Sequence, residues 1–256
     1  MSAPREVKTH AMVIRRARLR EADRVITLFT RELGKVSAMA KGVRKANARL
    51  AGHLELLTYT DITLARGKNL DTIIGSQTLS PHLAIRNSLE RTAYAMYLAE
   101  LVYHFAPEEQ ANEPLFDLLI ETMESLGETP NPELLVRYFE LNLLKNLGYR
   151  PELRRCPSCG TELKAVTNYF SPTSGGVLCP NCANELTAYP VSVSGLKVMR
   201  FLLENRYDAS SRLKLEPDLN REIGAIVRVY LHFLLEKGIR SAAWLDELKM
   251  NQPGST

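Results

Sequence analysis

A chain of 256 residues with 45% hydrophobic and 24% charged residues has the composition of an ordinary globular protein and can bury a core without cross-links. The first ten residues, MSAPREVKTH, are polar and mixed in charge, so no signal peptide is expected, and the longest apolar stretch, 223–235, is too short for a membrane span. We therefore expect a cytoplasmic protein without a membrane partner, whose thiols stay reduced.

Charge is unevenly distributed along the chain. Residues 1–80 carry 15 Lys and Arg against 7 Asp and Glu, a balance of +8, whereas residues 81–256 carry 18 against 22, a balance of −4. If the protein has a basic partner surface, we expect it in the N-terminal part.

Five short apolar runs of strand length occupy the first 80 residues, at 11–19, 24–30, 35–41, 57–65 and 71–79. Several alternate with the period of two that is typical of strands, and turn signals such as Gly34-Lys35 and Arg66-Gly67 separate them. Because a lone sheet of this size would expose its edges, the pattern predicts a small closed or nearly closed barrel.

Basic residues cluster within this barrel. One strand-like stretch and one glycine-containing loop hold Arg15, Arg16, Arg18 and Arg20, then Lys41, Arg44, Lys45 and Arg49. In an extended strand, Arg16, Arg18 and Arg20 would share a face at a spacing of about 6.5–7 Å, comparable with the phosphate repeat of an extended nucleic-acid strand. Such a row suits binding of single strands without sequence preference, although a merely solvated surface is the alternative. Phe29 and Tyr59 are the candidates for base stacking, and both could equally belong to the core.

From residue 81 onward the hydrophobic period becomes helical. Ser80 suits an N-cap and Pro81 a first helical position, before an apolar stripe that runs from Leu83 to Phe105. Further helices are predicted at 114–126, 132–147, 194–205, 217–237 and 241–249. The chain is therefore predicted to be α+β, with a barrel domain at 1–80 and a helical domain at 81–256 that carries an insertion at about 154–186.

The insertion holds all four cysteines, as Cys156-x2-Cys159 and, after 19 residues, Cys179-x2-Cys182. Two residues between cysteines let the backbone turn tightly, so that both sulfurs reach one metal ion at about 2.3 Å. The spacing predicts one Zn²⁺ bound by four thiolates, and it is structural because no coordination position stays open. Two disulfides or unligated thiols are the alternatives. The insertion could also contact nucleic acid through Arg154, Arg155 and Lys164.

No motif supports catalysis. The sequence lacks a Walker loop, HExxH and G-x-S-x-G, and its five histidines are scattered singly. We therefore expect a protein without enzymatic activity.

Several stretches resemble the bacterial recombination mediator family RecO. They are DRVITLFTRELGKVSAMAKGVRK (23–45), RLAGHLELLTYTDITLARGKNL (49–70), RYFELNLLKNLGYRPELRRCPSCG (137–160) and the later CPNC. The resemblance covers most of the chain and implies an OB-fold N-terminal domain, a helical C-terminal domain and a role in DNA repair. It implies binding of single- and double-stranded DNA, annealing of complementary strands and, with RecR, loading of RecA onto DNA coated by single-stranded DNA-binding protein.

The resemblance also implies two binding sites. The first is a DNA-binding surface that neutralises phosphates without reading sequence, which would associate the protein with the nucleoid. It would comprise Arg15, Arg16, Arg18, Arg20, Lys35, Lys41, Arg44, Lys45, Arg49, Arg66 and Lys68. The second would receive the acidic, apolar-ended C-terminal tail of single-stranded DNA-binding protein. The segment 134–144 offers Arg137, Tyr138, Leu141 and Leu144 for it, although a core stripe edged by one arginine explains these residues equally well.

A second functional class fits the same features. A zinc-ribbon protein-interaction module would use the cysteine insertion for partner contacts and the basic barrel for RNA. Similar affinity for RNA and DNA, without annealing, would favour it.

Overall fold

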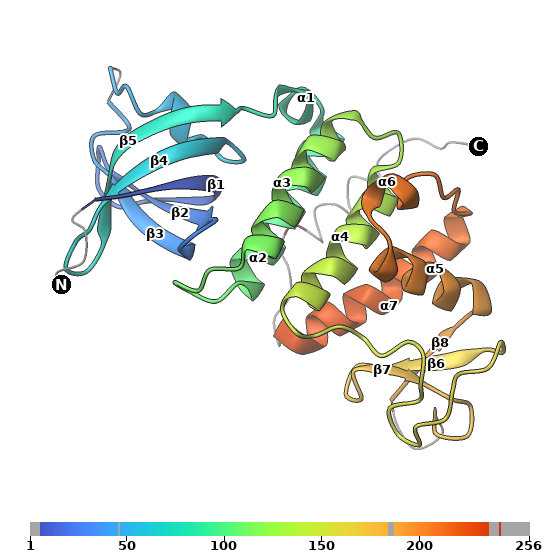
Figure 1. The fold of residues 1–256 in the computed structure, drawn as a ribbon. Coiled ribbons are helices and arrows are strands. Elements are labelled where there is room, and N and C mark those ends of the chain that lie inside the picture. Colours follow the sequence, from blue (N-terminus) through green and yellow to red (C-terminus); the bar gives the residue numbers. More distant parts are fainter. Residues whose placement is uncertain (1–5, 46, 184–186, 236–240, 242–256) are drawn as a thin grey trace. The chain divides into compact units, whose positions relative to one another are not determined.

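The computed structural model describes residues 6–45, 47–183, 187–235 and 241. The chain divides into two compact units, Met1–Glu128 with Ile239–Thr256 and Thr129–Gly238. Figure 1 shows a β-barrel with helices in the first unit, and helices with a small sheet in the second.

The first unit is built around a closed five-stranded barrel. Its strands are β1 (Glu6–Arg18), β2 (Arg24–Thr30), β3 (Gly34–Ala40), β4 (Tyr59–Ala65) and β5 (Asp71–Ser80), in the order β1-β2-β3-β5-β4. The long strand β1 closes the sheet, because it pairs with β4 from Glu6 to Met12 and with β2 from Ala11 to Arg18. A parallel pairing at Ala38 and Met39 joins β3 to β5. The predicted α+β class with an N-terminal barrel of the OB type is confirmed.

Alternate strand residues form the barrel core. Val13, Ile26, Leu28, Ile62 and Leu64 are fully buried, as period-two patterning requires. Each such side chain stabilises the fold by about 1.5–3 kcal/mol relative to exposure. The buried polar residues of the barrel strands, such as Thr30 and Thr60, make hydrogen bonds to backbone carbonyls.

In the described part of the first unit, the barrel is joined by the 3-10 helix η1 (Gly52–Leu54) and the α-helices α1 (Leu83–Arg86), α2 (Leu89–Phe105) and α3 (Glu113–Glu128). The helix start predicted at Pro81 is wrong, because His82 adopts φ 48° and α1 begins at Leu83, and the stripe from Leu83 to Phe105 is interrupted at Asn87 and Ser88. Ser80 ends β5, and Ser88 caps α2 by accepting a hydrogen bond from the Arg91 N–H.

Aromatic residues pack α3 against the barrel. The Phe116 ring centroid lies 6.0 Å from that of Phe29 and 6.2 Å from that of Tyr59. Phe29 is fully buried, so this candidate for base stacking belongs to the core. The same packing explains why the compact unit extends to Glu128, whereas the hydrophobic period changes near Ser80.

The second unit is a helical bundle with a three-stranded sheet. Its elements are α4 (Pro132–Asn146), β6 (Asn168–Ser171), β7 (Gly176–Leu178), β8 (Tyr189–Val191), α5 (Val193–Glu204), α6 (Tyr207–Ser210) and α7 (Pro217–Leu235). Every residue of α4 from Leu134 to Leu144 is buried, so this helix forms the centre of the unit. The predicted helix at 241–249 lies outside the described residues except for Ser241. No helix in the described part of the chain is long and apolar enough to span a membrane.

Candidate metal centre and nucleic-acid interface

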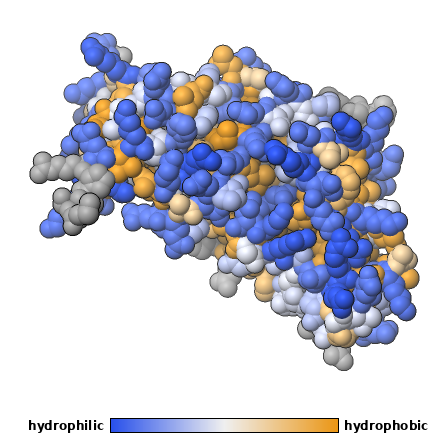
Figure 2. Space-filling view, in the orientation of Figure 1, coloured by the Kyte–Doolittle hydropathy of each residue, from blue (hydrophilic) through white to orange (hydrophobic). Residues whose placement is uncertain are grey.

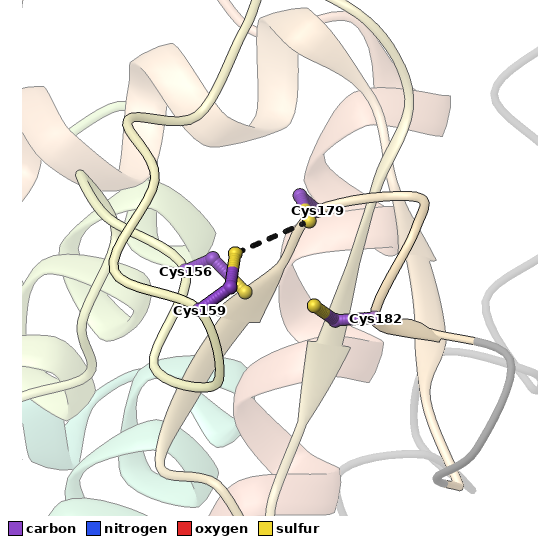
Figure 3. A group of neighbouring side chains, drawn as sticks. All are labelled: Cys156, Cys159, Cys179 and Cys182. Carbon is purple, nitrogen blue, oxygen red and sulfur yellow. Dashed lines mark hydrogen bonds between the residues drawn. The ribbon is translucent and has the colours of Figure 1, made fainter.

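The four cysteines converge on one point of the insertion. Their Sγ atoms all lie within 4.8 Å of one another, and those of Cys159 and Cys179 are 3.8 Å apart. Figure 3 shows the four side chains pointing toward a common centre. Zinc–sulfur bonds of about 2.3 Å at tetrahedral angles require sulfurs roughly 3.8 Å apart, so the cluster is compatible with a four-thiolate metal site.

Two backbone turns position these sulfurs. The Cys156 N–H donates to the Thr161 carbonyl at 2.8 Å and the Gly160 N–H to the Cys156 carbonyl at 2.8 Å, with Gly160 at φ +72°. In the second turn, the Cys182 N–H donates to the Cys179 carbonyl at 3.0 Å. Gly160 supplies the positive φ that closes the first turn. Each Cys-x2-Cys segment therefore forms a tight backbone turn, as its spacing predicts.

Hydrogen bonds already favour negative charge on part of the cluster. The hydroxyl of Thr161, with its backbone N–H, lowers the pKa of Cys159 to about 6. At Cys182 a bond from the Ser158 hydroxyl acts in the same direction, but the sulfurs of Cys179 and Cys159 outweigh it and raise the pKa of Cys182 to about 12. Four sulfurs this close resist ionising together unless a cation joins them, because a bound metal deprotonates its thiol ligands.

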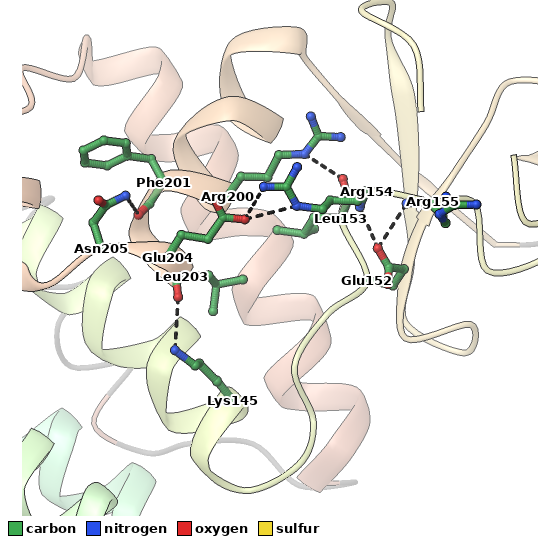
Figure 4. A network of polar contacts seen from close by, with 10 residues as sticks. All are labelled: Lys145, Glu152, Leu153, Arg154, Arg155, Arg200, Phe201, Leu203, Glu204 and Asn205. Atoms are coloured by element: carbon green, nitrogen blue, oxygen red, sulfur yellow. Dashed lines mark hydrogen bonds and ion pairs between the residues drawn. The ribbon is translucent and has the colours of Figure 1, made fainter. Parts of the chain in front are cut away.

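A polar network ties the insertion to the bundle (Figure 4). Arg154 donates from Nη2 to Glu204 Oε1 at 2.6 Å, and Arg200 donates from Nε to the Leu153 carbonyl at 2.8 Å. Glu152 accepts the backbone N–H groups of Arg154 and Arg155. All three predicted basic residues, Arg154, Arg155 and Lys164, are exposed, but Arg154 is already paired with Glu204.

A basic pocket of about 540 Å³ lies where two turns of the barrel meet. Arg20 of the β1–β2 turn, and Lys41 and Lys45 of the loop after β3, line it together with Asp23. Asp23 Oδ1 accepts the Gly42 N–H at 2.7 Å, and Gly42 adopts φ +63°. The lining holds three cationic side chains against this one carboxylate, so positive charge dominates the pocket.

The expected row of three arginines does not form on one strand face. β1 ends at Arg18, so Arg20 lies in the following turn and contributes to the basic pocket. Arg16 is half-buried, pairs with Glu55 and donates to the Leu54 carbonyl at 3.4 Å. The register shift of β1 lies before the row, between Val13 and Arg15, so Arg16 and Arg18 still share one face of the strand.

Lys35 is buried rather than presented to a ligand. Only 7% of the residue is exposed, and its Nζ donates to the Tyr103 carbonyl at 2.6 Å with Glu108 Oε1 at 3.4 Å. A helix C-terminus attracts cations, so Lys35 serves to hold α2 on the barrel. We exclude it from the nucleic-acid surface.

The other basic residues of the predicted DNA surface lie on the outside of the barrel. Arg66 pairs with Asp71 at 2.9 Å, and Arg44 donates to the Glu21 carbonyl at 2.6 Å. The turn between β4 and β5 holds Arg66 and Lys68. The exposed bases of the predicted DNA surface are Arg15, Arg18, Arg20, Lys41, Arg44, Lys45, Arg49, Arg66 and Lys68.

The predicted groove for a partner's acidic tail is closed. Arg137, Tyr138, Leu141 and Leu144 are at most 8% exposed, and Arg137 Nη1 lies 2.8 Å from Glu140 Oε2. Gly224 of α7 makes room for this guanidinium, since a Cβ there would lie 3.0 Å from Nη1. The four residues form part of the core of the second unit, as the alternative interpretation held.

The sequence analysis did not identify Tyr103, an aromatic residue that lies next to the predicted DNA surface. Tyr103, half-buried in the last turn of α2, lies beside Arg15 of β1, with the guanidinium carbon 4.5 Å from the ring centroid. The two residues are 88 positions apart, and no local pattern connects them.

Comparison with known proteins gives a consistent result. A family model described as recombination protein O N terminal matches residues 1–82, and one described as recombination protein O C terminal matches residues 86–243. A DNA repair protein RecO of Dehalococcoides mccartyi is 48% identical over 250 residues, which is 98% of this chain and 99% of that protein. Those of Roseiflexus sp. and Symbiobacterium thermophilum are 40% and 36% identical, over 96% and 93% of this chain and 87% and 96% of those proteins.

Proposed function

The chain belongs to the RecO family of DNA repair proteins, and we propose that it is a DNA-binding recombination mediator that works without catalytic turnover. It binds single- and double-stranded DNA and anneals complementary strands. With RecR it helps to load RecA onto DNA coated by single-stranded DNA-binding protein, in the cytoplasm at the nucleoid.

The observation that carries the proposal is the basic pocket between the two barrel turns. OB-folds bind oligonucleotides across β2 and β3 and with the loops between β1 and β2 and between β4 and β5. Here the first of these loops brings Arg20 to the pocket and the second presents Arg66 and Lys68. The ammonium groups of Lys41 and Lys45 add charge from the loop after β3. Cations gathered there suit a phosphate backbone without selecting a base sequence.

Annealing follows from the same electrostatics. Two polyanionic strands repel each other, and a shared cationic surface compensates that repulsion. On the face shown in Figure 2, hydrophilic residues predominate and hydrophobic ones are interspersed among them. Hydropathy does not give the sign of a charge, so the proposed attraction for DNA rests on cations such as Arg20, Lys41 and Lys45.

The four-cysteine cluster is proposed to hold one structural Zn²⁺. Thiolates are soft ligands that select zinc among the abundant cellular divalent ions, and four of them leave no position for water or substrate. Bound zinc would supply only a cross-link between the two turns of the insertion.

Strand annealing of fluorescent complementary oligonucleotides tests the function. We expect the wild-type protein to accelerate annealing, with and without single-stranded DNA-binding protein. The double variant Arg20→Gln/Lys45→Gln should anneal about ten-fold more slowly, because it loses part of the field that concentrates strands at the protein.

A matched control is the variant Arg212→Gln/Lys214→Gln, which removes two exposed charges from the second unit. It should anneal like the wild type. Absence of acceleration by folded, zinc-loaded protein would contradict the proposal, and equal affinity for RNA without annealing would favour the protein-interaction module instead.

A further inference from the structure

The end of α2 presents a cluster of aromatic and cationic side chains beside the barrel. We propose that Tyr103 and His104 of α2, with Arg15 of β1, form a stacking site for an unpaired base of single-stranded DNA. This inference rests on the proposed function, since it requires a strand to reach the first unit.

Arg15 is a cation whose charge remains available. It is exposed, its Nη1 donates to the Tyr103 hydroxyl, and its guanidinium carbon lies 4.5 Å from the centroid of that ring. Among the described residues it forms no ion pair, whereas Arg16 pairs with Glu55 and Arg66 with Asp71. The ring therefore orients a guanidinium without neutralising it.

The ring itself is held in place by the barrel. Lys35 Nζ lies 5.1 Å from the Tyr103 centroid while it donates to the Tyr103 carbonyl. The loop after α2 is fixed in turn, because the Glu109 N–H donates to the Lys35 carbonyl at 2.9 Å. At Gly34 a Cβ would approach the Gln110 carbonyl oxygen to 2.0 Å, so only glycine admits this contact. Figure 1 shows the chain turning from α2 back toward β3. A platform ordered in advance lowers the cost of binding.

A second ring extends the platform toward solvent. His104 meets Tyr103 edge to face, with centroids 5.1 Å apart and planes at 74°. Its side chain is 31% exposed, and Glu100 Oε1 lies 3.5 Å from its Nε2. Arg15 and Lys35 already lie over the Tyr103 ring. A base would therefore stack on the outer plane of the Arg15 guanidinium and on the exposed His104 ring, with Tyr103 holding both.

The accessibility of the aromatic side chains, and of the bases in DNA, indicates that the ligand is single-stranded. Phe29 is fully buried, and the half-buried Tyr59 packs against Phe116 and His10, so the exposed Arg15 and His104 offer the more open site. Bases in a duplex are stacked inside it and cannot reach a protein ring, whereas those of a single strand can. The site therefore predicts that the protein prefers single strands to duplexes.

The test measures the dissociation constants of the full-length protein for a single strand and for a duplex of equal length. We expect Tyr103→Leu to weaken single-strand binding by at least about five-fold, the low end for one base–aromatic stack, with duplex affinity within about two-fold of wild type. Tyr103→Phe keeps the ring but loses the hydroxyl that accepts from Arg15, so its single-strand affinity should lie between those of the wild type and Tyr103→Leu. His104→Ala should shift single-strand affinity in the same direction as Tyr103→Leu. Thermal unfolding checks that each variant folds.

Controls separate the possible results. Tyr149→Leu removes a 46% exposed tyrosine of the second unit and should leave both constants unchanged. An equal loss for single strand and duplex would overturn the stacking site and make Tyr103 a positioning residue for Arg15. If Tyr103→Leu does not fold, unchanged single-strand binding by His104→Ala overturns the inference. A wild-type protein that binds no DNA would instead refute the proposed function.

Discussion

At the scale of single residues, the role of a cation depends on which groups the fold places beside it. In the sequence, nothing distinguishes Lys35 and Arg137 from basic residues on the surface. In the structure, each is only 7% exposed. Lys35 donates to the Tyr103 carbonyl of α2, and Arg137 pairs with the Glu140 carboxylate. Arg20, by contrast, lines an open pocket. Such partners come from distant parts of the chain, so a run of charges in the sequence overstates the binding surface.

The Arg137–Glu140 pair gives a prediction at this scale. Both side chains lie in the core of the second unit, with Glu140 at 0% exposure. Arg137→Met should lower the free energy of unfolding by about 3 kcal/mol, because it leaves a buried carboxylate without its arginine. The double variant Arg137→Met/Glu140→Leu should recover most of that loss, since apolar groups of similar volume replace a buried pair at little cost. Urea unfolding measures both values, and a single variant as stable as the wild type would contradict the buried-pair interpretation.

At the scale of elements, the cysteine insertion is too small to be stable alone. Its sheet has strands of four, three and three residues, and the four cysteine sulfurs lie next to it. So few backbone hydrogen bonds cannot offset the entropy of ordering the segment, so much of its stability would come from the proposed zinc ion.

Metal removal therefore has an expected local effect. A strong chelator should abolish hydrogen-exchange protection at Val177, whose N–H donates to the Glu152 carbonyl at 2.8 Å, and leave the barrel strands protected. If metal removal lowers the free energy of unfolding of the second unit by about 2 kcal/mol, its Tm should fall by roughly 10 °C. Without chelator, Cys159→Ser should have the same Tm as the chelator-treated wild type. Adding chelator should not lower the Tm of this variant further. Uniform loss of protection across both units would contradict a local structural role.

At the scale of the whole molecule, the sequence predicted the strands and most helices well, because their periods of two and 3.6 are local properties. Two features needed the fold. The apolar stripe from Leu83 to Phe105 is interrupted after Arg86, because Ser88 is extended and starts α2 as its N-cap, which a hydrophobic pattern does not reveal. Likewise the helices α2 and α3 join the barrel unit through contacts such as Phe29–Phe116, which no sequence period reveals. The cysteine cluster was predictable because its spacing carries the geometry, whereas the basic pocket depends on two turns meeting.

The uneven charge of the chain leads to a prediction about salt. The excess of +8 in the first 80 residues is opposed by −4 in the remainder, so attraction to DNA depends on where cations lie and not only on their number. Each phosphate contact releases counterions, and log K for a single strand falls by about 0.7 per contact for each unit of log salt. Arg20→Gln/Lys45→Gln should therefore reduce the slope by about 1.4, measured as binding affinity over a salt series. Arg212→Gln/Lys214→Gln changes the net charge equally but should keep the wild-type slope. If both pairs flattened the slope alike, net charge rather than the basic pocket would govern binding, and the pocket would lose its role as the DNA contact.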